Sequence, residues 1–155
     1  MPGPGYILDP AFESGSDALG SLPLCDVRLQ RDARFPWLIL IPRVASAREL
    51  EDVAPAGRAM LMDEILLAGQ AVRAISRALG RPIIKLNVGA LGNITRQLHV
   101  HVVGRRADDE AWPGPVWGVA GAVEYRASDL QAAMAAVAEI LAPTGTIVWP
   151  GAGGF

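Results

Sequence analysis

The chain has 155 residues, of which 51% are apolar and 19% charged, and its net charge is −2 at pH 7. This length and composition suit one globular domain with an ordinary core, and they exclude a disordered tail or a fibre. There is no basic excess to hold a long nucleic acid by its phosphates, and the apolar run Trp37–Ile41 is far too short to cross a membrane.

The N-terminal residues and the single cysteine bear on the compartment. The chain starts MPGPGYILDP, without the basic start and apolar stretch of a secretory signal. Cys25 has no second cysteine with which to form an intramolecular disulfide or a thiolate metal cage, so we expect it to be a small buried hydrophobe. We therefore expect a cytoplasmic protein that has no membrane segment.

The first half of the chain predicts two strands and a short helix. Leu24–Gln30 and Trp37–Ile41 are rich in branched apolar residues, and the turn Arg31–Arg34 joins them as a hairpin. Ser46–Glu49 has the spacing of a capping box, with a hydroxyl three residues before a glutamate. It predicts a short helix that Pro55 interrupts or restarts.

A long amphipathic helix is predicted from about residue 56 to residue 79. Its apolar positions recur every three or four residues: Leu61, Ile65, Ala68, Val72, Ile75 and Leu79. Gly80 and then Pro82 end the pattern, as is common after a helix.

The second half predicts strands at Pro82–Asn87 and Gln97–Val103, joined by the glycine-bearing loop Asn87–Asn93. A second capping box, Ser128–Gln131, opens a helix that continues to about residue 142. The tail 143–155 is open to three interpretations: an edge strand, an arm that reaches a partner, or a mobile segment.

The order of these elements predicts one α+β domain over residues 1–155, with its core at about 24–118. Strands, a long helix and further strands are typical of an antiparallel sheet covered by helices, here with about five strands.

Both histidines of the chain lie in the segment RQLHVHVVGR, two residues apart. On a strand, residues i and i+2 point to the same face, so His99 and His101 share a face with Gln97 and Val103. The pair has three open interpretations: an exposed polar strand face, a metal site, and a nucleophilic imidazole. A metal would need further ligands, for which the scattered carboxylates have no supporting spacing.

The third interpretation is chemically specific. A histidine attacks phosphorus when one ring nitrogen is unprotonated and aimed while the other donates to a fixed acceptor. A second imidazole two residues later neutralises charge on the phosphate or protonates the leaving oxygen. A glycine-bearing loop before the strand would supply backbone N–H groups to the phosphates.

QLHVHVV resembles the histidine-triad (HIT) motif, His-φ-His-φ-His-φ-φ, with glutamine in place of the first histidine. WLILIPR resembles the family's strand that ends in LVIP and a basic residue, KLNVGALGN its phosphate loop, and WPGPVWG its tryptophan-proline segment. The resemblance spans about Leu24 to Gly118 and favours the bacterial branch with Gln-φ-His-φ-His. It implies a HIT-like fold and a homodimer.

The resemblance also implies roles for individual residues. His99 would be the nucleophile that forms a nucleotidyl-histidine, and His101 would contact phosphate and leaving oxygens. Asn87 and Asn93 would lie beside the phosphates and Asp32 beside the ribose hydroxyls. The base pocket would be lined by Val27, Leu29 and Leu24.

Two departures from the family pattern concern the polar groups behind the nucleophile. Gln97 stands in the first triad position, where an amide can still accept and donate hydrogen bonds. Trp37 stands where the family has another histidine. We expect these replacements to remove the usual polar backing of the site.

Several of these residues also have a structural interpretation. Asp32 suits a cap of the Arg31–Arg34 turn, and Asn93 suits a left-handed turn after Gly92. Trp112, Trp117 and Trp149 suit packing or interface anchors. Arg105 and Arg106 suit a solvated strand end or, alternatively, contact with a polyphosphate.

The function implied by the resemblance is a nucleotide hydrolase or transferase that acts at an α-phosphate, on adenosine nucleotides, dinucleoside polyphosphates or phosphoramidates. No metal or other cofactor is expected, because imidazoles and backbone donors supply the electrostatics. One alternative is a nucleotide-binding or regulatory module with little turnover, and a second is a metal-binding enzyme that uses the same two histidines.

Overall fold

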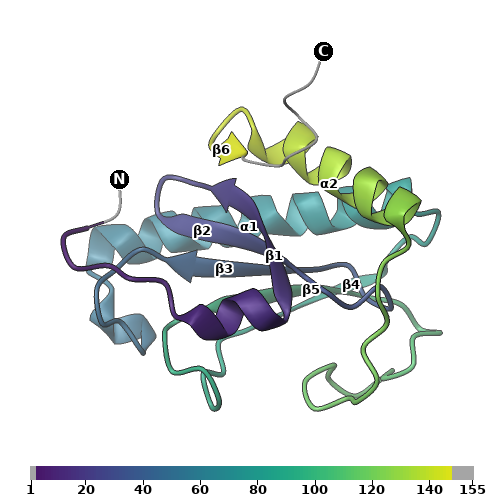
Figure 1. The fold of residues 1–155 in the computed structure, drawn as a ribbon, viewed down its shortest axis with the longest axis horizontal. Coiled ribbons are helices and arrows are strands. Elements are labelled where there is room, and N and C mark those ends of the chain that lie inside the picture. The colour runs from purple at the N-terminus through teal and green to yellow at the C-terminus, as the bar shows by residue number, and fades with distance from the viewer. Residues whose placement is uncertain (1–2, 148–155) are drawn as a thin grey trace.

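The computed structural model describes residues 3–147, and these form an antiparallel sheet with helices (Figure 1). The strands lie in the order β4-β5-β3-β2-β1-β6. Their bounds are β1 (Ser16–Ser21), β2 (Cys25–Gln30), β3 (Trp37–Pro42), β4 (Lys85–Gly89), β5 (Val100–Arg105) and β6 (Thr146–Ile147). Every neighbouring pair is antiparallel. This confirms the α+β class with an antiparallel sheet.

Two α-helices, α1 (Pro55–Ala78) and α2 (Ala127–Leu141), pack against each other and cover one face of the sheet. Two 3-10 helices, η1 (Pro10–Ser14) and η2 (Leu50–Asp52), complete the fold. Figure 1 shows η1 in front of the sheet and α1 behind it, so η1 lies on the face opposite the long helix.

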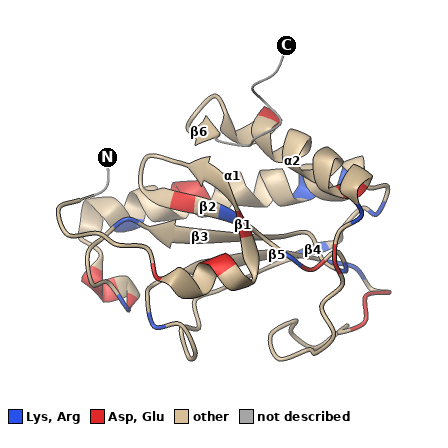
Figure 2. Ribbon diagram, in the orientation of Figure 1, with Lys and Arg blue, Asp and Glu red and all other residues tan. Residues whose placement is uncertain are grey.

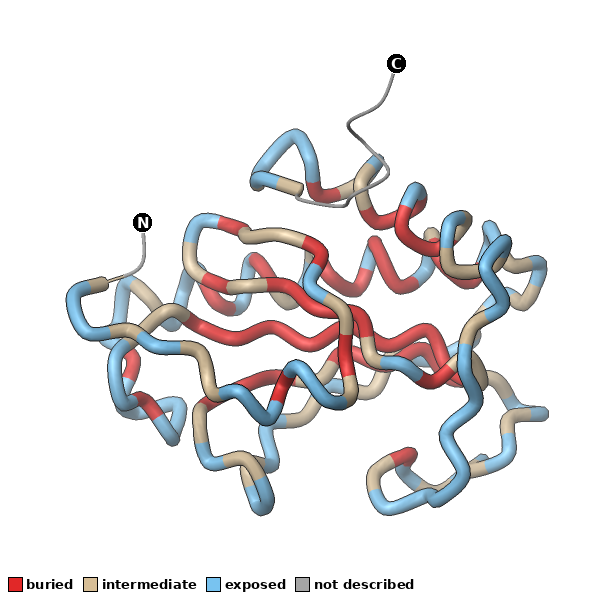
Figure 3. Tube along the Cα trace, in the orientation of Figure 1, coloured by how far each residue is buried: buried red, intermediate tan, exposed pale blue. Residues whose placement is uncertain are grey.

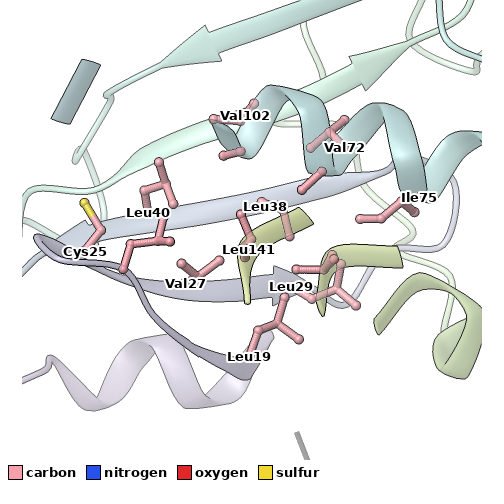
Figure 4. Packing of buried hydrophobic residues seen from close by; sticks show 14 of the residues in the cluster. Leu19, Cys25, Val27, Leu29, Leu38, Leu40, Val72, Ile75, Val102 and Leu141 are labelled. Atoms are coloured by element: carbon pink, nitrogen blue, oxygen red, sulfur yellow. The ribbon is translucent and has the colours of Figure 1, made fainter. Parts of the chain in front are cut away.

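The helix-covered face holds the main core. Alternate residues of the strands point into it, among them Val27 and Leu29 of β2 and Leu38 and Leu40 of β3, all with no exposed surface. Val72 and Ile75 of α1 and Leu141 of α2 meet them there (Figure 4). In Figure 3 the central strands and the inward sides of both helices are buried.

The opposite face carries a second, smaller apolar cluster. It is formed by Phe12, Phe35, Trp37, Ile39, Ile41, Val103 and Val116. The intervening residues of the same strands therefore pack under η1 and under the segment after β5. Each face of the sheet thus has its own set of covering segments.

The structure also corrects several predicted elements. β1 and η1 were not expected, so the ordered fold begins well before Leu24. The box at Ser46–Glu49 does not form: Ser46 has φ +59°, and the carboxylate of Asp52 accepts from the N–H groups of Arg48 and Glu49, at 2.9 Å each. The short helix is therefore η2.

Helix α2 begins at Ala127, so Ser128 lies inside it rather than at its cap. The prediction of the long helix is confirmed to within a residue at each end, and Gly80 ends it with φ +67°. Of the tail, Thr146–Ile147 pairs with β1 as an edge strand, whereas residues 148–155, with Trp149, lie outside the described residues.

Charged residues lie mostly on helices, turns and loops around the rim of the sheet (Figure 2). No helix within residues 3–147 combines the length and apolarity that a membrane span needs.

Candidate functional site

The two histidines point to the same face of the sheet, as their spacing predicts. Their ring centroids lie 4.9 Å apart with the ring planes at 79°. The residues between and after them, Val100 and Val102, point into the helix-covered core. The alternation of β5 therefore brings both imidazoles together on the face that the long helix leaves free.

His99 lies immediately before β5 and is held by the backbone oxygen of Gln97 and by η1. Its Nδ1 lies 2.7 Å from the backbone oxygen of Gln97, and the ring of Phe12 meets it edge-on at 5.0 Å between centroids. A carbonyl oxygen can only accept a hydrogen bond, so Nδ1 of His99 carries the proton. This leaves Nε2 of His99 with a free lone pair, which is the form of imidazole that attacks an electrophile.

His101 is held in the opposite tautomer. The indole Nε1 of Trp37 donates to His101 Nδ1 at 3.0 Å, and an indole N–H can only donate. The neutral ring of His101 therefore carries its proton on Nε2. Burial, with a smaller contribution from the charge of nearby His99, lowers the pKa of His101 to about 4, so the ring is neutral at pH 7.

The two rings line a cavity of about 550 Å³ on this face. Its walls come from η1 and the start of β1, from β2 and β3, from the loop before β5 and from the segment after it. The lining residues are Ala11, Phe12, Ser14, Gly15, Ser16, Gln30, Trp37, Ile39, Leu91, Gly92, Asn93, Ile94, Thr95, His99, His101, Trp117 and Gly118. The mixture of apolar and polar groups around two imidazoles suits a ligand with a flat apolar part and an anionic part.

A metal site, the second interpretation of the histidine pair, would need further ligands. Within residues 3–147 no group of three or more His, Cys, Asp and Glu side chains is placed to hold a metal ion. Of the two imidazoles, His99 keeps a free lone pair on Nε2, whereas His101 accepts the indole N–H at Nδ1 and has its proton on Nε2.

A family model for the HIT domain matches residues 11–108, which is well over half of the chain. The chain belongs to the histidine triad (HIT) family. This family is one of nucleotide-binding hydrolases and transferases. The match begins at η1, which agrees with a fold that starts earlier than the sequence pattern indicated.

Solved structures of HIT proteins agree over almost the whole chain. A histidine triad protein from Bradyrhizobium japonicum is 37% identical, with a TM-score of 0.82, over 88% of this chain and 98% of that one. One from Sinorhizobium meliloti 1021 is 41% identical, with a TM-score of 0.78, over 88% and 97%. One from Marinobacter aquaeolei VT8 is 32% identical, with a TM-score of 0.78, over 90% and 98%. A search of curated proteins finds no match.

The first position of the HIT triad has a different task in this chain. The side-chain amide of Gln97 is not part of the cavity lining; it contacts the backbone of the N-terminal segment at Ile7 and Asp9. Trp37, at the position of the other family histidine, supplies the N–H donor to His101. The expectation that these replacements remove the polar backing is therefore wrong for Trp37.

Asn93 lines the cavity with Gly92, whereas Asp32 and Asn87 lie elsewhere. Gly92 has the positive φ of this loop, at +67°, so the left-handed interpretation of Asn93 is wrong. Asp32 is buried and accepts from the backbone N–H of Arg34 and, in an ion pair, from its guanidinium at 2.7 Å. This is the turn-capping interpretation. Asn87 accepts from Arg105 Nη1 at 2.8 Å.

The predicted base pocket is wrong, because its residues lie on the helix-covered side of the sheet. Val27 and Leu29 have no exposed surface and pack in the main core, where the partly buried Leu24 also packs. Their neighbour Gln30 points to the other face and lines the cavity, together with Ile39 of β3. The polar residues of β2, rather than its apolar ones, indicate which side of the strand faces the cavity.

The two arginines after the histidines do not form a solvated strand end. Arg105 is 1% exposed and pairs with the buried carboxylate of Asp109 at 2.8 Å. Arg106 pairs with the exposed Asp108. Neither lines the cavity of the histidines. Of the tryptophans, Trp112 stacks near Arg105, and Trp117 lies in the cavity wall, 5.9 Å from the ring of His101.

The residues of η1 and of the start of β1 were missed altogether. Phe12, Ser14 and Ser16 line the cavity although they lie more than eighty residues before the histidines. The sequence signal available was Asp9-Pro10 before Ala11, a capping residue followed by the proline that often starts a helix. Nothing in that signal indicates that the short helix packs on His99.

Proposed function

We propose that the protein is a nucleotide hydrolase or transferase that acts at an α-phosphate through a covalent intermediate on Nε2 of His99. The observation that carries this is the pair of fixed and opposite tautomers. His99 has its lone pair on Nε2 because its Nδ1–H donates to Gln97 O, and His101 has its proton on Nε2 because the indole of Trp37 donates to Nδ1. A nucleophile and a hydrogen-bond donor side by side are what attack on a phosphoryl group needs.

The chemistry divides into two displacements. In the first, Nε2 of His99 forms a bond to the α-phosphorus and the bond from that phosphorus to the leaving group breaks. In the second, a water or an alcohol attacks the same phosphorus and gives up its proton to bulk water, and the bond between that phosphorus and Nε2 of His99 breaks, which returns the neutral imidazole. The Nε2–H of His101 donates to the phosphoryl oxygens in both steps and keeps its proton.

This role for His101 restricts which leaving groups depart easily. A neutral imidazole does not surrender its last proton, so the leaving group departs most easily as a stable anion, such as a phosphate or a nucleotide. Among the substrates implied by the HIT resemblance, adenosine nucleotides and dinucleoside polyphosphates meet this condition better than phosphoramidates. The phosphates would lie against the loop with Gly92, Asn93 and Thr95, and the base against Phe12 and Ile39.

The test compares the wild type with His99→Ala and His101→Gln on a diadenosine polyphosphate. We expect His99→Ala to lose at least about a thousandfold in kcat and to form no covalent adduct by mass spectrometry of acid-quenched protein. His101→Gln should still form the adduct, more slowly. Equal release of nucleotide by the wild type and His99→Ala would overturn the proposal. Tight nucleotide binding without turnover or adduct would favour the regulatory module instead.

We also propose that the protein is a homodimer that joins through the outer edge of β4. Exposed apolar residues gather there: Val88 lies on the strand, Ile84 lies just before it, and Met62 and Leu66 lie on α1. Leu86 of β4 lies close against Gly69, which places that strand next to the helix. Sedimentation velocity should give a dimer at micromolar concentration, and Val88→Asp should shift it to monomer. A wild-type monomer would contradict this assembly.

A further inference from the structure

The side chain of Gln97 makes two hydrogen bonds to residues about ninety positions earlier in the chain. Its Nε2 donates to the backbone oxygen of Ile7 at 2.9 Å, and its Oε1 accepts from the backbone N–H of Asp9 at 2.8 Å. We propose that Gln97 is a positioning residue that clamps the N-terminal wall, residues 9–16, onto the cavity. This inference rests on the proposed function, because it assigns the wall to the binding of that substrate.

The clamp is connected to the nucleophile through a short series of contacts. Asp9, whose N–H is held by Gln97, caps η1 by accepting from the N–H of Ala11 at 2.9 Å. Phe12, in the middle of η1, is buried and meets the ring of His99 edge-on at 5.0 Å. Holding the backbone at Asp9 therefore fixes where η1 begins and so where Phe12 presses on His99.

The far end of the wall has its own anchor. Ser16 Oγ donates to the backbone oxygen of Phe12 at 2.6 Å, and the buried Arg28 donates to Ser16 Oγ at 2.7 Å and pairs with Glu13 at 3.1 Å. The wall is thus held at two points, by Arg28 after η1 and by Gln97 before it. Five of its residues, from Ala11 to Ser16, line the cavity. Loss of the Gln97 anchor frees the backbone at Asp9, and the next side-chain hydrogen bond towards the N-terminus is then the one that the hydroxyl of Tyr6 donates to Asp26 at 2.9 Å.

The amide group suits this task better than an imidazole would. A glutamine side chain presents its acceptor and donor on one carbon and in nearly parallel directions, as the C=O of Ile7 and the N–H of Asp9 require. A neutral imidazole also has one donor and one acceptor, but they diverge from different corners of the ring. A histidine in the first triad position would therefore release one of the two backbone groups.

The clamp can be tested without disturbing the nucleophile. It is the backbone oxygen of Gln97 that holds His99 Nδ1, and this oxygen remains when the side chain is changed. We would compare Gln97→Met and Gln97→His with Gln70→Met and Gln70→His, in which an exposed glutamine of α1 undergoes the same substitutions. Both classes of variant keep the full chain.

The first readout is hydrogen–deuterium exchange of residues 7–16. Both Gln97 variants should exchange the Asp9 amide about tenfold faster than the wild type, because two hydrogen bonds are lost or weakened, and the Gln70 variants should match the wild type. Unchanged exchange at Asp9 in Gln97→Met would overturn the clamp, whatever the enzyme does.

The second readout separates positioning from catalysis. We expect both Gln97 variants to raise KM for the dinucleoside polyphosphate about tenfold and to change kcat less than threefold. A large fall in kcat with KM unchanged would make Gln97 a catalytic residue and overturn the proposal. A higher kcat in Gln97→His, as completion of a triad would produce, would also overturn it.

The third readout is a double-mutant cycle with Phe12→Ala. If Gln97 acts through the wall, the combined variant should raise KM little more than either single variant. If the two substitutions raised KM by strictly multiplicative factors, Gln97 would not act through the wall. If the wild type neither binds nor turns over nucleotides, the proposed function fails, and the exchange measurement then decides the clamp alone.

Discussion

The two faces of the sheet come from the same strands but are held together by different means. On the helix-covered face, residues such as Leu38 and Leu40 pack against α1 and α2 with no exposed surface and no polar partner to satisfy. On the opposite face, His99, His101 and Gln97 are fixed by directed hydrogen bonds to a carbonyl, an indole and a backbone segment. Apolar packing tolerates small shifts, whereas each directed bond also selects a proton position, and only the second face can therefore carry acid–base or nucleophilic chemistry.

The largest effect on stability should come from the helix-covered face. Leu38→Ala removes a fully buried side chain and should lower the free energy of unfolding by about 4 kcal/mol, measured by urea denaturation. Its neighbour Ile39 points to the other face and lines the cavity, so Ile39→Ala is the matched control and should raise KM as well. If Leu38→Ala altered KM as much as Ile39→Ala, the separation of the faces would not hold.

A buried ion pair between Arg105 and Asp109 adds to the stability of the site face. Arg105 and Asp109 are 1% and 3% exposed, and Asp109→Ala leaves the guanidinium buried without its partner. We expect a loss of about 3 to 4 kcal/mol in the free energy of unfolding. Asp108→Ala, which removes the exposed partner of Arg106, is the control and should cost less than about 1 kcal/mol. Equal losses would contradict the burial of the first pair.

Acid should weaken the site face specifically. The pKa of His101 is lowered from 6.5 to about 4. At pH values between these two, the unfolded chain therefore binds a proton at this residue and the folded chain does not. The stability contributed by this group is complete above pH 6.5 and is lost as the pH falls towards 4, by at most about 3 kcal/mol. His101→Gln should remove this part of the pH dependence of unfolding, and an unchanged slope would contradict it.

The smallest effect concerns the tautomer of His101. Trp37→Phe keeps a large ring but removes the N–H that donates to Nδ1, so the proton of His101 is free to occupy either nitrogen. We expect kcat to fall about tenfold, with the free energy of unfolding reduced by no more than about 1 kcal/mol. Full activity in Trp37→Phe would show that the indole does not set the proton position.

The sequence predicted the helix-covered face well because periodicity reports burial. Apolar residues every three or four positions gave α1 to within a residue at each end, and the alternation around His99 and His101 gave their common face. These signals depend only on neighbours in the chain. They are also the signals that specify which side of a strand faces the core.

The site face was predicted only in part because its walls come from distant segments. The short helix η1 has too few residues for a periodic pattern, and its contact with His99 depends on hydrogen bonds between residues 7–9 and Gln97. Val27 and Leu29 were assigned to a base pocket by resemblance to the family, although apolar residues at those positions indicate the core. Asp32 was assigned to the ribose by the same resemblance, but its carboxylate pairs with Arg34 in the turn.

The contact between Gln97 and the N-terminal segment has a consequence for the order of folding. The two hydrogen bonds span 88 and 90 residues, and β1, β2, β3, α1 and β4 lie between their ends. Loop closure over such a length costs entropy that the earlier elements must already offset. During synthesis, residues 7–9 cannot form these hydrogen bonds until Gln97 has been added to the chain, so this end of the cavity wall is completed only after β1, β2, β3, α1 and β4 have been synthesised.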